Sequence, residues 1–175
     1  MKFRFTLASV LSVISMLLFG AVASAATDFT QFGFTNVVAE KKIKAGEEAK
    51  ISHSGIKIAI PEGTFQHDVI FQVLEGDNKN FQANAPEGEI VIMNFAFKVT
   101  DMETGQLVDK FTPAITFSFK DKEVNNLSTY YNVKTDGTFV KNNSTSVIEG
   151  KTLSHPVGAA PVGWAITSPR DSIEK

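Results

Sequence analysis

The 175-residue chain contains no cysteine. This absence excludes a disulfide-stapled miniprotein, a zinc finger, an iron–sulfur protein and a cysteine-dependent enzyme. An excess of positive charge is also absent, with 17 Lys and Arg against 19 Asp and Glu, so we expect no nucleic-acid partner. Tyr (2) and Trp (1) are scarce, but Phe is abundant (15), and 43% of the residues are hydrophobic. That hydrophobic content excludes a disordered chain.

The first 25 residues have the three-part pattern of a bacterial secretory signal peptide. Lys2 and Arg4 form a positive start, an apolar run follows, and Ala-Ser-Ala at residues 23–25 is a small-x-small cleavage site. A membrane anchor is the alternative, because the apolar run approaches the roughly 20 residues that span a bilayer. We expect cleavage, since no charged flank follows the run. The prediction is a secreted, periplasmic or cell-surface protein without membrane insertion after cleavage.

Removal of the leader would leave residues 26–175, that is 175 − 25 = 150 residues with 15 basic and 19 acidic side chains. A domain of this size buries about 70% of the surface of its unfolded chain. Its stability would depend on packing alone, even in a compartment where disulfides form. We expect an arm or first strand at residues 26–35, one domain at residues 36–168 and a polar tail at residues 169–175.

Apolar and polar residues alternate along most of the mature chain. Residues 56–60 read Ile-Lys-Ile-Ala-Ile, and residues 95–99 and 115–119 alternate in the same way. This period of two predicts strands with one face in a core and one toward water. The best candidate for a helix is short, at residues 39–50, and Gly46 interrupts it.

Turn signals separate the alternating segments. Asp136-Gly137 lies between two short alternating runs, and Asp followed by Gly favours a hairpin turn. Glu149-Gly150 separates two further short runs. We predict nine or ten short strands in an all-β, antiparallel β-sandwich. A barrel is less favoured, because the strand lengths are uneven and prolines stand at strand ends.

The segment Ile-Ala-Ile-Pro-Glu-Gly-Thr-Phe at residues 58–65 resembles a hydrophobic-Ile-Pro-x-Gly-x-Phe segment of ZU-type β-sandwich domains, known from ankyrins, netrin receptors and bacterial surface proteins. Residues 112–119, 127–140 and 153–166 are similar to further strands of those domains. Phe139 stands where they often carry Trp, and the connection at residues 156–161 is longer than theirs. The resemblance implies binding and assembly roles and transfers no catalytic residue.

Three phenylalanines precede the regular pattern, at Phe29, Phe32 and Phe34. They predict a first strand, a flexible arm, or a segment that adds to the sheet edge of a neighbouring molecule. Strand addition uses main-chain hydrogen bonds together with alternate apolar side chains. Our leading hypothesis is therefore a non-catalytic exported structural or binding module, with a protein partner or a second copy of the chain at the cell surface.

A metal site is one alternative, centred on the three histidines His53, His67 and His155. They are far apart in the sequence, and none has the close spacing of a zinc or copper motif. His67 beside Asp68 is the best ligand pair, since carboxylates often orient a metal-binding imidazole. Adjacent residues on a strand, however, point to opposite faces. We predict no bound cofactor.

Carbohydrate binding and hydrolysis are the remaining alternatives. A sugar platform could use Tyr130, Tyr131 or Trp164, but the adjacent tyrosines would point to opposite faces, and we expect Trp164 in the core. A secreted hydrolase would need Ser, His and Asp converging in a pocket. The sequence has no Gly-x-Ser-x-Gly elbow, and we predict that the protein is not an enzyme.

Overall fold

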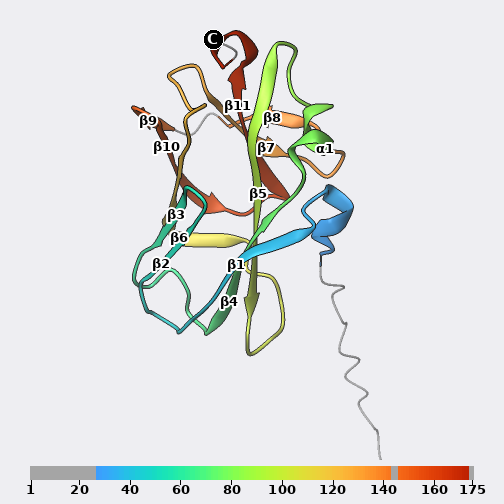
Figure 1. Ribbon diagram of the computed structural model, residues 1–175. Helices are drawn as coiled ribbons and strands as arrows, with labels where there is room; N and C mark the ends of the chain where they lie inside the picture. The colour runs from blue at the N-terminus through green and yellow to red at the C-terminus, as the bar shows by residue number, and fades with distance from the viewer. Residues whose placement is uncertain (1–26, 143–145, 174–175) are drawn as a thin grey trace, which may run out of the picture.

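Two antiparallel sheets face each other in the computed structural model, which describes residues 27–142 and 146–173 (Figure 1). The predicted signal peptide lies outside the described residues. One sheet has six strands in the order β1-β4-β5-β11-β7-β8, and the other has five in the order β2-β3-β6-β10-β9. The predicted all-β antiparallel sandwich is therefore confirmed, although the described residues form eleven strands instead of the nine or ten predicted.

The six-stranded sheet contains β1 (Asn36–Ile43), β4 (Val69–Glu75), β5 (Glu89–Asp101), β11 (Gly163–Pro169), β7 (Thr129–Val133) and β8 (Phe139–Lys141). The five-stranded sheet contains β2 (Ala49–His53), β3 (Ile56–Ile60), β6 (Lys110–Lys120), β10 (Thr152–Ala159) and β9 (Val147–Glu149). Three short helices complete the described part of the fold: η1 (Phe29–Phe32), α1 (Asn78–Gln82) and η2 (Arg170–Ser172). Within the two described ranges, no helix has the length and apolarity needed to cross a membrane.

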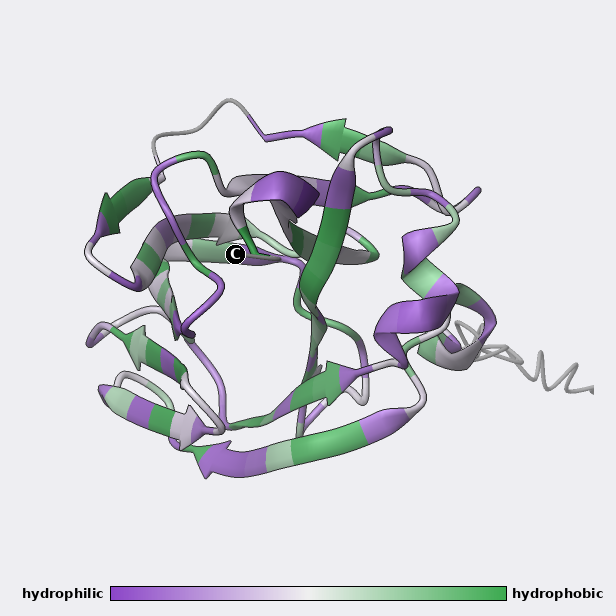
Figure 2. Cartoon of the chain, turned by 45° about the horizontal axis from the view of Figure 1, so that its top comes forward, coloured by the Kyte–Doolittle hydropathy of each residue, from purple (hydrophilic) through white to green (hydrophobic). Residues whose placement is uncertain are grey.

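The alternation in the sequence corresponds to the two faces of each strand. Along β3, Ile56, Ile58 and Ile60 are buried, whereas Lys57 and Ala59 are exposed. Figure 2 shows the same bands of hydrophobic and hydrophilic residues along several strands. The predicted hairpin turns are also present, because Asp136-Gly137 connects β7 to β8 and Glu149-Gly150 connects β9 to β10.

The best candidate for a helix, residues 39–50, does not form one. This segment contains the end of β1, a turn and the start of β2. Gly46 lies in the turn at a φ of 77°, and its N–H donates to the Phe65 carbonyl at 2.9 Å. The segment forms a strand because β1 pairs with β4 along its length. A short amphipathic segment is stabilised mainly by its tertiary partners.

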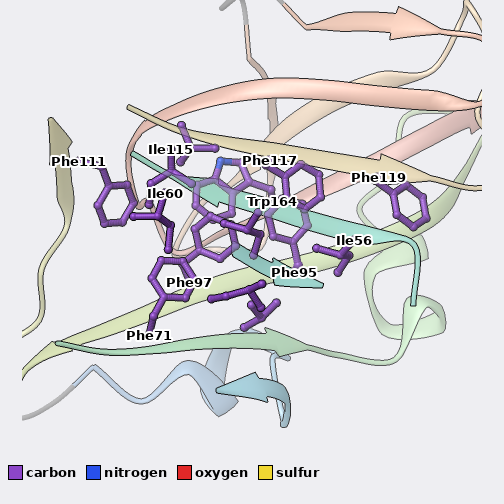
Figure 3. Packing of buried hydrophobic residues seen from close by; sticks show 14 of the residues in the cluster. Ile56, Ile60, Phe71, Phe95, Phe97, Phe111, Ile115, Phe117, Phe119 and Trp164 are labelled. Atoms are coloured by element: carbon purple, nitrogen blue, oxygen red, sulfur yellow. The ribbon is translucent and has the colours of Figure 1, made fainter. Parts of the chain in front are cut away.

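Large aromatic side chains fill the space between the sheets. Phe95 stacks on Phe117, with ring centroids 4.0 Å apart, and Trp164 stacks on Phe95 at 5.0 Å. Figure 3 shows these rings among isoleucines of β3 and β6. We call the buried side chains between the two sheets, which include Phe95, Phe97, Phe117, Tyr130 and Trp164, the inner cluster. Trp164 is 1% exposed, which confirms its predicted place in the core.

A second group of apolar side chains, which we call the outer cluster, packs on the opposite face of the six-stranded sheet. Its buried members are Phe29, Phe34, Leu74, Phe81, Val91, Ala96, Val133 and Ala165. Ala96 and Ala165 alternate with Phe95 and Trp164 of the inner cluster, so the two clusters lie on opposite faces of β5 and β11. The outer cluster therefore joins η1 and α1 to the sheet.

The amino-terminal arm packs against two glycines that leave no room for a side chain. A Cβ on Gly163 would lie 2.3 Å from Cζ of Phe34, and a Cβ on Gly76 would lie 2.0 Å from the Gly33 carbonyl oxygen. The buried Asn94 side chain holds the Gly76 main chain in place. Its Oδ1 accepts the Gly76 N–H at 2.7 Å, and its Nδ2 donates to the Gly76 carbonyl at 2.9 Å. Glycine is needed at both positions, since a side chain would push the arm away.

Candidate ligand-binding cleft

A cleft of about 490 Å³ opens between the two sheets, where β7, β10 and β11 approach the start of β6. Its volume lies within the range of small-ligand sites. The lining residues are Asp109, Lys110, Asn132, Asn142, Trp164 and residues 155–161.

Two carboxamides form a polar wall of the cleft. Nδ2 of Asn142 donates to Oδ1 of Asn132 at 3.0 Å, and the Asn142 main-chain N–H donates to the Tyr130 carbonyl at 3.0 Å. The Nδ2 hydrogens of Asn132 have no partner among the described residues. A carboxamide both donates and accepts hydrogen bonds, so this wall suits a ligand that does the same.

Trp164 also lines the cleft, although almost all of its side chain is buried. Its position in β11 directs the indole toward the interior, where it packs between Phe95 and Phe97. The indole N–H has no hydrogen-bond partner among the described residues. Because Trp164 lines the cleft, this donor is available to a polar ligand there.

His155 lies at the inner side of the cleft and belongs to the core. Its ring stacks on Tyr130, with centroids 4.0 Å apart, and its Nδ1 lies 2.8 Å from Oγ of Ser146. Burial lowers the pKa of His155 to about 4, so the imidazole is neutral at physiological pH. The Tyr130 hydroxyl is buried without a partner among the described residues, and burial raises its pKa far above the usual value.

Two free strand edges flank the cleft. Within the described part of the chain, β9 pairs with β10 only from Thr152 to Ser154, so residues 156–159 have no partner strand on that side. In the other sheet, β8 is the edge strand and, among the described residues, pairs only with β7. The cleft therefore offers main-chain hydrogen-bonding groups as well as side chains.

His67 and Asp68, the predicted ligand pair, have different partners. His67 Nδ1 lies 2.9 Å from Oδ2 of Asp101 and 3.6 Å from Oε2 of Glu103. Asp68 Oδ1 instead accepts the Ala45 N–H at 2.9 Å. Backbone N–H groups, foremost that of Thr104, lower the pKa of Asp101. The sequence suggested Asp68 because it is adjacent to His67, but the carboxylates near His67 come from the end of β5 and the turn after it.

The other two predicted ligands lie elsewhere. His53 ends β2 and contacts the Ser54 hydroxyl at 3.2 Å, whereas His155 lies in β10. No group of three or more His, Asp or Glu side chains that could hold a metal ion occurs among residues 27–142 and 146–173. Metal binding by His53, His67 or His155 stays a prediction.

The predicted assembly residues lie within the arm. Phe29 and Phe34 are buried in the outer cluster, and Phe32 is partly buried against it. The arm forms the η1 turn instead of a strand, because the Asp28 carboxylate accepts the Thr30 N–H at 3.0 Å. Assembly through these phenylalanines stays a prediction, but two of the three already have partners inside the chain.

The tyrosines point to opposite faces, as the sequence predicted. Tyr130 joins the inner cluster, and Tyr131 lies on the outer face, where its hydroxyl donates to the Glu89 carboxylate at 3.1 Å. Burial and the Glu89 charge raise the pKa of Tyr131. Sequence reasoning missed Asn132, although it stands at an inward position of the same alternating strand. A polar residue at such a position is a usable signal for a site.

The chain matches no protein-family model and no curated protein.

Proposed function

We propose that this protein is a non-catalytic, exported binding module that holds an extended segment of a partner protein in the cleft. The observation that supports this function is the polar cleft between two strand edges that have no partner among the described residues, β8 and residues 156–159 of β10. Export rests on the signal-peptide pattern of residues 1–25. The resemblance to ZU-type domains of surface proteins agrees with a binding role at the cell surface.

The chemistry of the cleft fits a polypeptide segment. Each peptide unit carries one donor and one acceptor, which suit the carboxamides of Asn132 and Asn142, the Trp164 N–H and the free main chain of β10. Pro156 has no N–H and lies exposed in that free edge. A proline at an edge limits continued sheet growth, so the edge favours a short partner segment over open-ended aggregation.

A hydrolase is the second candidate, because Ser146 Oγ lies 2.8 Å from His155 Nδ1 beside the cleft. A general base works best when its pKa lies near the working pH. The pKa of His155 is lowered to about 4, and its ring stacks on Tyr130 inside the core. This histidine is therefore a poor base for serine at neutral pH, and the proposal remains non-catalytic.

A cleft-filling variant tests the function. Gly158 lines the cleft, and a Cβ built on it meets no atom within 4 Å, so Gly158→Phe should fill the cleft without displacing the backbone. Phage-displayed random peptides would be selected on the mature chain, and their affinities measured by the emission of Trp164. The matched control is Ala59→Phe, on the exposed outer face of the same sheet.

We expect selected peptides to bind the native chain and the Ala59→Phe variant equally, and to bind Gly158→Phe at least tenfold more weakly. Failure to select any peptide would contradict the proposal. Equal binding to Gly158→Phe would also contradict it, because the peptide would then occupy another surface. Ester or amide hydrolysis that disappears in Ser146→Ala would establish the hydrolase instead.

A further inference from the structure

A second concave surface lies on the side of the molecule opposite the interior of the sandwich. η1, α1 and the turn between β7 and β8 come together there and border a groove of about 310 Å³ (Figure 1). The groove shares no lining residue with the cleft. Its three walls come from residues 31–33, 80–84 and 135–137, so only the folded outer cluster assembles it.

Glycine and a phenylalanine ring form the base of the groove. Gly33 has a φ of 92°, and a Cβ there would lie 3.1 Å from Cζ of Phe81. Gly137 has a φ of 82°, and a Cβ there would lie 3.1 Å from Nδ2 of Asn84. The positive φ angles favour glycine, and the missing side chains leave the space between the walls open.

The polar groups on the walls are mostly carboxamides. Gln31, Asn80 and Asn84 are exposed, and their side chains make no hydrogen bond to the described residues; the same holds for the Thr135 hydroxyl. Each of these groups can donate and accept. Phe32 adds a partly exposed ring to the same groove.

The charge of the groove is also informative. Among the described residues, no Lys, Arg or His lines it, and Asp136 is the one ionisable residue that does. The Asp136 carboxylate accepts the Thr138 N–H at 2.9 Å and the Thr138 hydroxyl at 2.7 Å, and these bonds lower its pKa. A fixed negative charge repels anionic ligands, so the groove suits a neutral one.

We propose that this groove binds a neutral carbohydrate. Sugar hydroxyls donate and accept hydrogen bonds, as the three carboxamides and Thr135 do, and the C–H face of a sugar ring can lie on Phe32. The arm thus has a functional role that differs from strand addition, because it forms one wall of the groove. This inference does not depend on the cleft or on its partner.

The test is isothermal titration of the full mature chain with cellotriose, chitotriose and maltotriose, and with trigalacturonic acid as an anionic probe. We expect saturable binding of at least one neutral trisaccharide and at least tenfold weaker binding in the double variant Asn80→Ala, Asn84→Ala. Lys79→Ala is the matched control, since Lys79 is an exposed residue of the same helix outside the groove. Gly158→Phe should keep the affinity, which separates this site from the cleft.

Absence of binding by all three neutral sugars at millimolar concentration would overturn the proposal. Tighter binding of trigalacturonic acid, or unchanged affinity in the double variant, would overturn it equally. The thermal midpoint of each variant shows whether it is folded. If the double variant unfolds, the single variant Gln31→Ala on η1 provides the same test from another wall.

Discussion

The inner and outer clusters use the same residue type for different purposes. Phe95 of the inner cluster stacks on Phe117 at 4.0 Å and joins two sheets, whereas Phe34 of the outer cluster packs on Phe81 at 4.9 Å and joins two short helices to one sheet. Both Phe95 and Phe34 are 0% exposed. Burial alone therefore does not reveal what a phenylalanine holds together.

The difference between the clusters should appear in how substitutions in each one change unfolding. Loss of inner contacts weakens the association of the two sheets, so we expect it to affect global unfolding. Loss of outer contacts releases η1 and α1, and the sheet beneath them retains its other face. Parts of a protein that open separately do so with free energies below the global value.

The largest effect is expected for Phe95→Ala. Truncation of a fully buried phenylalanine costs about 3–5 kcal/mol, and here it also removes the stacking partner of Phe117 and Trp164. We expect a loss of about 4 kcal/mol in the free energy of unfolding, measured by urea denaturation. Phe95→Leu should lose much less. A loss below about 1 kcal/mol for Phe95→Ala would show that the inner cluster does not hold the sheets together.

Phe34→Ala should cost less, about 2–3 kcal/mol, because release of the arm limits the total loss. The far-ultraviolet spectrum should keep its strand signal, while affinity for neutral trisaccharides falls with the groove. Gly163→Ala should have the same consequences, since the added Cβ would lie 2.3 Å from Phe34. Equal losses for Phe34→Ala and Phe95→Ala, with complete unfolding in both, would remove the distinction between the clusters.

The pH dependence of the free energy of unfolding should come from His155, which packs on Tyr130 of the inner cluster. His155 has a pKa of about 4 in the folded chain against 6.5 ordinarily. As the pH falls from 6.5 toward 4, the unfolded chain takes up a proton that the folded chain does not, so stability falls. The expected loss is about 2 kcal/mol between pH 6.5 and 5.

Comparison with His155→Gln isolates this titration, because the partly buried Glu75 has a raised pKa and contributes with the opposite sign. The variant should lose the pH dependence in this window. Phe34→Ala should retain it, since the buried members of the outer cluster are all apolar. An unchanged slope in His155→Gln would assign the dependence to other groups.

The smallest effect is expected for Tyr130→Phe, also in the inner cluster. The Tyr130 hydroxyl is buried without a partner among the described residues, and an unpaired buried hydroxyl is unfavourable. Its removal should change stability by no more than about 1 kcal/mol, toward greater stability. A clear destabilisation in urea would indicate that the hydroxyl has a partner, such as a bound water.

The inner cluster was largely predictable from the sequence, and the outer cluster was not. The alternation at residues 56–60 and 115–119 identified strands that carry their own burial signal. Phe34 carries no such signal, because its partner Phe81 is 47 positions away (81 − 34) in a five-residue helix. So short a helix has no apolar period, and only the cap at Asp77 marks its start.

The sites show the same limit. The edge strand β1 carries lysines that obscured its alternation, so its segment resembled a helix. The cleft combines Asn132 of β7, Trp164 of β11 and the end of β10, whose relative positions depend on strand order. The strand order cannot be inferred from residue type and spacing along the chain. The three phenylalanines singled out the arm in the sequence, but only the fold shows that the arm borders a groove.

Native-state hydrogen exchange tests most directly whether the two clusters are separate units. We predict that amides of η1 and α1 exchange together, with an opening free energy below that of β5, β6 and β11, and that Phe34→Ala lowers only the former. One common opening free energy for all these segments would contradict the account. So would an absence of protection in η1, because the arm would then not pack on the sheet.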